Sequence, residues 1–193
     1  MAEGTLTPSL RQGLNARQAE TVEKLLVAGE AELDEVGPEA LTVRTVAQRA
    51  GVSPATAYTY LASKHHLFAE LFWRRLVTDP GPEPTGATAT DRVRTVTRHM
   101  AVMLGRSPHL ATAANLALLG TDPEVERLRL VIGGEFVRRF RDAIGTPVEP
   151  AVLEALTFAF SGALLQAGMG LVTYDQLSKR LDDVVAVILE GRA

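Results

Sequence analysis

The sequence predicts an all-α protein with about nine helices in two parts. Apolar residues recur at spacings of three and four along most of the chain, as they do on one face of a helix, and alternation at a spacing of two is almost absent. Residues 78–89, TDPGPEPTGATA, contain three prolines, two glycines and no large apolar side chain. Such a composition is typical of a linker, so four helices are expected before it and five after it.

The first helix is expected from about Asn15, which can cap it, to Val36, where Gly37 and Pro38 end it. The remaining helices are expected at about 43–50, 54–61, 64–77, 91–106, 109–119, 123–144, 150–172 and 174–189. This pattern predicts an N-terminal domain over 1–77, including a disordered tail over about 1–14, then the linker and a C-terminal helical domain over 90–193.

Composition excludes several classes of protein. The formal net charge is -3, so the chain is not basic as a whole. It contains no cysteine, which excludes a disulfide framework, thiolate metal sites and a cysteine nucleophile. The start of the chain lacks the basic residues and apolar stretch of a secretory signal, so we expect a cytoplasmic protein.

Residues 155–172 form an uncharged stretch of about the length that a membrane span requires. Ser161 and Gln166 interrupt it, Glu154 and Asp175 lie close to its ends, and flanking lysines or arginines are missing. Small residues recur at every fourth position and would let another helix approach closely: Ala155, Ala159, Ala163 and Ala167. We therefore predict a buried helix and no membrane span.

The most informative stretch is Leu41–Lys64, LTVRTVAQRAGVSPATAYTYLASK. Thr42 can cap a first short helix, and Gly51 stands where the chain must turn. Ser53 followed by proline is a typical helix start. Two short helices joined by such a turn predict a helix-turn-helix, which places its second helix in the major groove of DNA.

The second short helix would present a polar outer face. Its start carries partial positive charge and free N–H groups that suit phosphate oxygens, and its hydroxyl groups can bond phosphates or base edges. The exposed set would be Ser53, Ala55, Thr56, Tyr58 and Tyr60. Both tyrosines could instead be half-buried packing residues, and that alternative stays open for Tyr60 above all.

Local charge supports an encounter with DNA. Between Leu41 and Leu76 there are five basic side chains and one acidic one, a local charge of +4. Acidic residues gather instead in and just after the first helix: Glu30, Glu32, Asp34, Glu35 and Glu39. This division predicts a positive surface facing phosphates and an acidic surface behind it.

The stretch Leu41–Lys64 resembles the signature of the tetracycline-repressor-like (TetR) regulators. The chain resembles these proteins closely from about Ala16 to Leu76, and after that only in the number and length of its helices. The resemblance implies an all-helical homodimer. Its N-terminal helix-turn-helix domain would bind a palindromic operator, and its C-terminal domain would dimerise and hold a small-molecule inducer.

By position, the resemblance makes Thr42 and Lys64 phosphate contacts and Arg44 a base-reading residue. The recognition helix would carry Ser53, Pro54, Ala55, Thr56, Tyr58 and Tyr60. It has no Arg, Lys, Asn or Gln, the side chains that bind bases with two hydrogen bonds, so specificity would depend on Arg44 and on DNA shape. Arg44 could instead be a solvated helix residue, and Pro54 could serve only to start the helix.

The second half shows no catalytic set. The four histidines are scattered and lack the spacing of a helical zinc site: His65, His66, His99 and His109. The chain has no nucleophile elbow, phosphate-binding loop or dinucleotide-binding glycine motif. We predict no enzyme activity, no cofactor and no metal.

An apolar ligand pocket is the favoured role for the C-terminal helices. Methionine and aromatic side chains with a few polar groups suit an irregular apolar effector. The candidates are His99, Met103, Asn115, Phe136, Phe140, Phe158 and Met169. The alternative is that these side chains simply fill a helical core.

The last two helices, over about 150–189, are expected to form the homodimer contact. The final helix has an apolar stripe made of Leu177, Leu181, Val184, Val185 and Ile188. In the family's geometry, the two helices and their symmetry mates would form a four-helix bundle.

The leading hypothesis is a repressor that a small apolar ligand releases from a palindromic operator. One alternative is a DNA-binding dimer without an inducer. The other is a soluble helical carrier or enzyme that keeps a vestigial helix-turn-helix.

Overall fold

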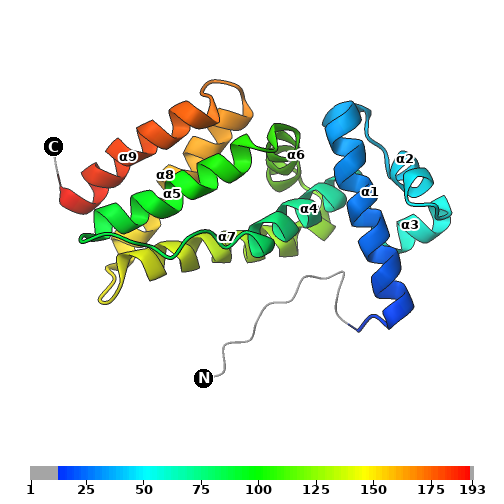
Figure 1. Cartoon of the computed structure of the whole chain (residues 1–193), viewed down its shortest axis with the longest axis horizontal. Coiled ribbons are helices and arrows are strands. Elements are labelled where there is room, and N and C mark those ends of the chain that lie inside the picture. The colour runs from blue at the N-terminus through cyan, green and yellow to red at the C-terminus, as the bar shows by residue number, and fades with distance from the viewer. Residues whose placement is uncertain (1–12, 192–193) are drawn as a thin grey trace. The chain divides into compact units, whose positions relative to one another are not determined.

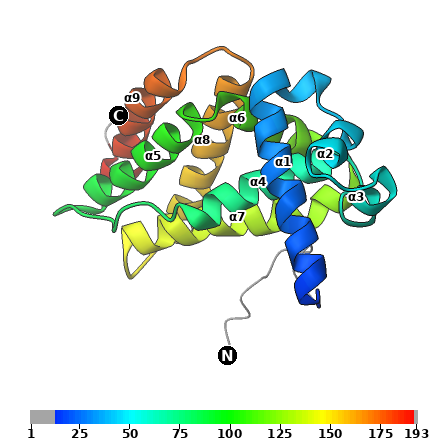
Figure 2. The same cartoon turned by 45° about the vertical axis from the view of Figure 1, so that its right-hand side comes forward.

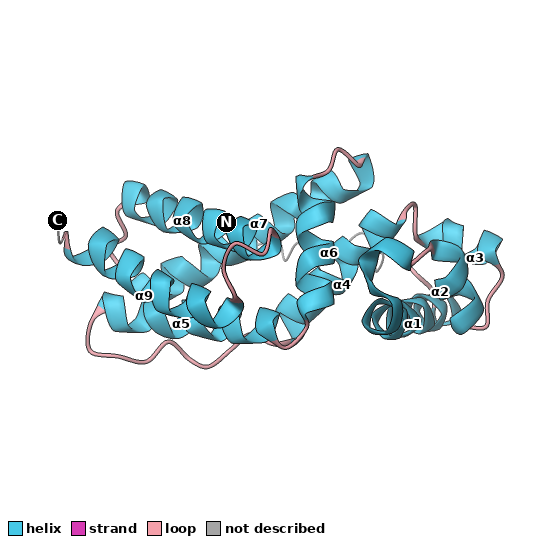
Figure 3. Ribbon diagram, turned by 90° about the horizontal axis from the view of Figure 1, so that it is seen from above, coloured by secondary structure: helices cyan, strands magenta, loops and turns pink. Residues whose placement is uncertain are grey.

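A computed structural model describes residues 13–191, and every regular element in that range is a helix (Figures 1 and 3). The predicted tail over about 1–14 lies almost entirely outside the described residues. The elements are α1 (Ala16–Ala40), α2 (Val43–Arg49), α3 (Pro54–Tyr60), α4 (Lys64–Thr78), α5 (Ala89–Gly105), α6 (Pro108–Leu119), α7 (Pro123–Ile144), α8 (Pro150–Gly168) and α9 (Tyr174–Glu190). The all-α prediction is confirmed.

The chain divides into two compact units. The N-terminal unit comprises Met1–Val77 and Thr112–Ile132, and the C-terminal unit comprises Thr78–Ala111 and Gly133–Ala193. The break after Val77 coincides with the start of the predicted linker. The division also runs through α6 and α7, so the simple partition into 1–77 and 90–193 stays a prediction.

In the N-terminal unit, α1 packs against α2, and α2 lies beside α3 (Figure 2). Large apolar side chains from α1, from α4 and from the turns that follow α1 and α3 are less than 2% exposed and form its core: Leu25, Leu33, Leu41, Leu61, Leu67 and Phe68. Gly29 on α1 permits a close approach to α4, since a Cβ atom there would lie 2.9 Å from Leu67 Cδ1.

The predicted end of the first helix is visible as a break in the backbone. Gly37 has φ 75° and ψ 171°, a conformation that glycine tolerates and other residues avoid. Helical hydrogen bonding nevertheless extends to Ala40, because the turn that follows Pro38 closes when Leu41 N–H donates to Gly37 O at 3.3 Å. The continuous helix is therefore interrupted at Gly37, as predicted, and one further turn carries α1 to Ala40.

In the C-terminal unit, α9 lies along both α5 and α8 (Figure 1). The ring of Phe160 meets Phe136 and Phe140 edge to face, with centroids 5.2 Å and 5.6 Å apart. Arg94 of α5 fastens α9 by donating through Nε and Nη2 to Asp182 O at 3.1 Å and 3.0 Å. Aromatic packing and α5–α9 hydrogen bonds thus hold the unit together.

The prediction for residues 155–172 was wrong in two respects. The helix stops at Gly168, because Gly170 adopts φ 73° and Leu171 N–H folds back to Gln166 O at 3.0 Å, a typical glycine-terminated helix end. The helix is also not buried in the single chain. Among the described residues, α8 is the one helix long and apolar enough to cross a membrane by length and composition, with 17% of its most apolar window buried.

Replacing Phe160 with alanine removes the ring that Phe136 and Phe140 both contact. We expect the free energy of unfolding to fall by about 3–5 kcal/mol, because the site would keep a cavity. Chemical denaturation followed by circular dichroism measures the change. Val102→Ala, at a position 47% exposed on α5, is the matched control and should stay within about 0.5 kcal/mol of wild type. Equal losses in both variants would contradict a core role for Phe160.

Candidate nucleic-acid interface

The first short helix is capped as predicted. Thr42 Oγ1 accepts the N–H of Thr45 at 3.1 Å, and Thr45 Oγ1 accepts the N–H of Thr42 at 3.2 Å. This reciprocal arrangement satisfies amides at the start of α2 that would otherwise lack partners. It fixes the direction in which α2 begins while leaving Thr42 itself exposed.

The turn and the second helix start also follow the sequence prediction. Gly51 has φ 68°, and Val52 N–H donates to Ala47 O at 3.0 Å to close the turn. Ser53 Oγ accepts the N–H of Thr56 at 3.1 Å, with Pro54 at the first helical position. The helix-turn-helix geometry therefore comes from local bonds that the sequence already indicated.

The outer face of α3 is open to solvent. Ala57 and Leu61 are buried beneath it, as predicted, whereas Tyr58 is 50% exposed. Ser53, Pro54 and Ala55 are exposed as well, and Thr56 and Tyr60 are half-buried. The hydroxyl of Thr56 is 2.8 Å from Ser53 Oγ, so it contributes to the cap as well as to the surface.

A groove beside α3 brings in residues that the sequence analysis missed. Asn15, Arg17, Gln18 and Thr21 from the start of α1 line it together with Val52, Ser53, Thr56 and Tyr60. Arg17 is exposed and adds a cation next to the recognition helix. No motif links Arg17 to α3 along the sequence, because the two are joined only by the packing of α1.

The predicted positive surface is smaller than the local charge of +4 suggests. Arg49 pairs with Glu32 at 2.7 Å and with Glu35. Two arginines of α4 pair with α1 in the same way: Arg74 with Glu23 at 2.5 Å, and Arg75 with Glu30. Four acidic residues of α1 therefore lie against the basic residues instead of all forming a separate surface behind them.

Arg44 and Lys64 differ in the interactions that their charged groups make within the protein. Lys64 Nζ donates to Pro38 O at 3.1 Å and Glu39 O at 3.2 Å, so its ammonium ties the start of α4 to the end of α1. Arg44 is exposed, and none of the ion pairs found within residues 13–191 involves it. Arg44 is thus the freer cation for DNA, while a phosphate would have to share Lys64 with two carbonyl groups.

The start of α4 is held by a hydrogen bond from the turn between α6 and α7. Ser63 Oγ accepts the N–H of His66 at 3.0 Å and donates to Asp122 Oδ2 at 2.5 Å. The Ser63 bond holds the pKa of Asp122 below its usual value, helped by the N–H of Glu124. Asp122 therefore stabilises the helix that follows the helix-turn-helix.

The residues predicted to bind a ligand are not gathered around one cavity. Met103, Phe136 and Phe140 are buried, whereas Phe158 on α8 is 68% exposed and Met169, which directly follows α8, is 56% exposed. Asn115 is half-buried in the N-terminal unit, and His99 lines a separate cavity in the C-terminal unit. Across residues 13–191 there is also no group of three histidine or acidic side chains that could hold a metal ion.

Comparison with known proteins identifies the family. Residues 25–71 match the family described as "Bacterial regulatory proteins, tetR family". The chain is 43% identical to an HTH-type transcriptional regulator of Mycobacterium tuberculosis over 179 residues, which cover 92% of this chain and 84% of the relative. The chain belongs to the TetR family. It is a transcriptional regulator with an N-terminal DNA-binding helix-turn-helix and a C-terminal helical part.

Other TetR-family similarities are more distant. The HTH-type transcriptional repressor KstR of Rhodococcus jostii is 27% identical over 146 residues, which cover 72% of this chain and 69% of the relative. A TetR transcriptional regulator from Rhodococcus sp. RHA1 shares the fold with a TM-score of 0.75 at 22% identity, over 93% of this chain and 100% of that one. The fatty acid degradation regulator FadR of Bacillus halodurans has a TM-score of 0.61 at 15% identity, over 89% and 95%.

The Ser63–Asp122 bond predicts a pH-dependent contribution to stability. Because the folded-state pKa of Asp122 lies below its unfolded value of about 3.9, the contribution is present above that pH and is lost as the pH falls through the folded value. We expect Asp122→Asn to lower the melting temperature near neutral pH, and the difference from wild type to shrink below about pH 4.

Melting curves of both proteins between about pH 3 and pH 7 measure this difference. Asp183→Asn, at an exposed position on α9, is the control and should melt like wild type throughout. A wild-type advantage over Asp122→Asn that does not change with pH would rule out the carboxylate as its source.

Proposed function

We propose that this TetR-family regulator is a cytoplasmic repressor that binds a palindromic operator as a homodimer and is released by a small apolar ligand. The observation that supports this proposal is the exposed face of α3, whose helix starts at the Ser53 cap, together with the exposed cation Arg44 on α2, whose helix starts at the Thr42 cap. Two such helices in successive major grooves would bind the two halves of a palindrome.

Contacts with DNA would be divided between positioning and base recognition. Lys64, Thr42 and the start of α3 would contact phosphates, which set the register without reporting sequence. Arg44 would bind a base edge, and Tyr58 with Ala55 would contribute hydroxyl and apolar contacts in the groove. Arg17 supplies a further phosphate contact from α1, since it lines the groove beside α3.

Dimerisation would use α8 and α9. Phe158, Ala159, Gly162 and Ala163 of α8 line an open groove with Val184 of α9. Phe158 is 68% exposed and Val184 38% exposed in the single chain. An apolar surface of this kind favours a partner, and the small residues of α8 would let a second copy approach closely. This packing would also cover the apolar length of α8.

For a ligand to release the repressor from DNA, it would have to bind preferentially to a conformation of the dimer that fits the operator poorly. A differential affinity of a few kcal/mol is enough to move such an equilibrium. Met103, Phe136 and Phe140 are buried apolar side chains of the C-terminal unit, and an apolar ligand would have to be accommodated among them. The aromatic packing around Phe160 favours the alternative of a DNA-binding dimer without an inducer, because these rings already fill the core.

Selection of genomic DNA fragments with the purified protein tests DNA recognition. We expect a palindromic sequence to be enriched and to shift in gels at nanomolar protein. Enrichment of no sequence at all would favour a carrier or enzyme with a vestigial helix-turn-helix. A single non-repeated half-site would contradict the proposed dimer on a palindrome.

Arg44→Ala is expected to cost about 1–3 kcal/mol in operator affinity and to relax the preference at one base position. Titrations at fixed salt against the operator and its single-base variants measure both effects. Arg141→Ala, which removes an exposed arginine of α7, is the control for loss of charge and should bind as wild type does. Unchanged specificity in Arg44→Ala would show that Arg44 is only a solvated side chain.

Thermal melts against a library of lipophilic compounds test the inducer. We expect at least one compound to raise the melting temperature and to release the operator in the same concentration range, because it binds the folded form preferentially. If compounds stabilise the protein without releasing DNA, or none binds, the regulator without an inducer is the better account.

A further inference from the structure

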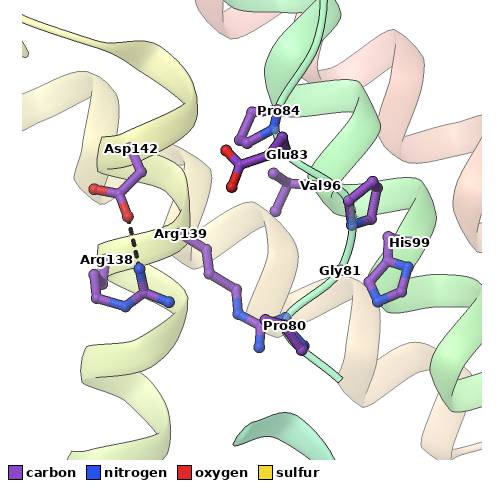
Figure 4. A pocket seen from close by; sticks show the side chains of 10 residues that line it. Pro80, Gly81, Glu83, Pro84, Val96, His99, Arg138, Arg139 and Asp142 are labelled. Atoms are coloured by element: carbon purple, nitrogen blue, oxygen red, sulfur yellow. Dashed lines mark hydrogen bonds and ion pairs between the residues drawn. The ribbon is translucent and has the colours of Figure 1, made fainter. Parts of the chain in front are cut away.

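A cavity of about 220 Å³ lies in the C-terminal unit between α5, α7 and the segment that follows α4 (Figure 4). Its walls are Pro80, Gly81, Pro82, Glu83, Pro84, Val96, His99, Arg138, Arg139 and Asp142. The volume is below the roughly 300–1,000 Å³ of pockets for drug-sized molecules, so it suits a small ligand. The buried side chains of Met103, Phe136 and Phe140 do not line the cavity.

The proline-rich wall, residues 79–84, is attached to the helices beside it. Asp79 Oδ1 lies 2.9 Å from His99 Nε2, and Arg139 Nη2 donates to Asp79 O at 3.4 Å. Gly81 has φ 82°, and a Cβ atom at that position would lie 2.7 Å from His99 Cδ2. Only glycine allows the segment to pass this close to His99, so specific contacts hold this wall in place within the unit.

The basic side chains of the cavity are already neutralised. Arg138 contacts Glu135 and Asp142, each at 2.7 Å, and Arg139 contacts Glu135 at 2.7 Å. Burial raises the pKa of Glu135, but the hydrogen bonds from the two arginines outweigh burial and hold it below its usual value. Glu135 therefore stays charged and occupies both guanidinium groups.

The remaining charge favours a cation. Two carboxylates, Glu83 and Asp142, line the cavity together with two guanidinium groups and one imidazole. Outside the lining, Asp79 pairs with His99, and Glu135 pairs with both arginines. Counted together with these two ion-pair partners, the carboxylates outnumber the guanidinium groups by four to two. Glu83 is exposed, and its carboxylate is directed toward α7 in Figure 4. Within residues 13–191 no ion pair involves it.

We propose that this cavity binds a small organic cation, an alkylamine or short diamine. Its ammonium group would pair with Glu83 at the mouth, and its hydrocarbon chain would lie against Pro80, Pro84 and Val96, which supply the apolar part of the wall. The site takes a ligand opposite in character to the apolar effector of the core. It stands on the cavity alone and holds whether or not the protein is a repressor.

Isothermal titration calorimetry of the full-length protein tests the site, with butylamine, putrescine and butyrate as probes. We expect the two amines to bind and the carboxylate, which has the same apolar chain as butylamine, not to bind. Glu83→Gln should weaken amine binding about fivefold, as expected for the loss of a partly exposed ion pair. Glu83 lies on an exposed segment, so this variant should fold normally.

Glu149→Gln is the control, because Glu149 is exposed beside α8 and its side chain makes no capping bond. It should bind amines as wild type does. Binding of butyrate in preference to the amines, no amine binding at millimolar concentration, or equal weakening by both substitutions would each overturn the proposal. None of these results bears on operator binding, which the DNA titrations measure separately.

Discussion

The DNA-binding unit depends on the packing of α1 against α2 and α4. Leu25 and Leu33 of α1 are almost fully buried, as are Leu61 and Leu67, and each such side chain contributes roughly 1.5–3 kcal/mol on burial. The ion pairs along the same contact are partly exposed, so solvent screens them and they contribute little to stability. Apolar burial therefore holds the unit together, and the ion pairs set which charges remain for DNA.

This arrangement explains why the charge available to DNA is concentrated at a few residues. Arg49, Arg74 and Arg75 are paired to α1, and Lys64 is bound to carbonyl groups at its end. Affinity for the phosphate backbone follows the number of free cations, so we expect a modest dependence on salt. Specificity is then expected to depend on Arg44, on the hydroxyl-bearing face of α3 and on groove shape.

The C-terminal unit has a tightly packed aromatic core, an exposed apolar face on α8 and a separate cavity. Phe136, Phe140 and Phe160 pack against one another, while Phe158 on the other side of α8 is left exposed. A second copy is the partner proposed for that face. The cavity beside Pro80–Pro84 is lined by charged as well as apolar side chains, so any ligand there would differ in chemistry from one in the core.

Local structure could be predicted where neighbouring residues determine it. The caps at Thr42 and Ser53 and the turn at Gly51 act over three or four residues, and the sequence located each of them correctly. The end of α8 was predicted four residues late, because its uncharged composition obscured the glycine-terminated turn at Gly170. The burial of that helix within the single chain was also predicted wrongly, because a stripe of small apolar residues does not specify which segment packs against it.

The sequence by itself determined the helical class, the helix-turn-helix and the TetR resemblance, because periodicity and capping are properties of adjacent residues. Only the tertiary structure decided that the arginines of α2 and α4 are paired to α1, that Arg17 joins the face of α3, and that Glu83 stands over a cavity. These contacts form only when segments that are distant in the sequence pack together, and local sequence patterns do not predict them.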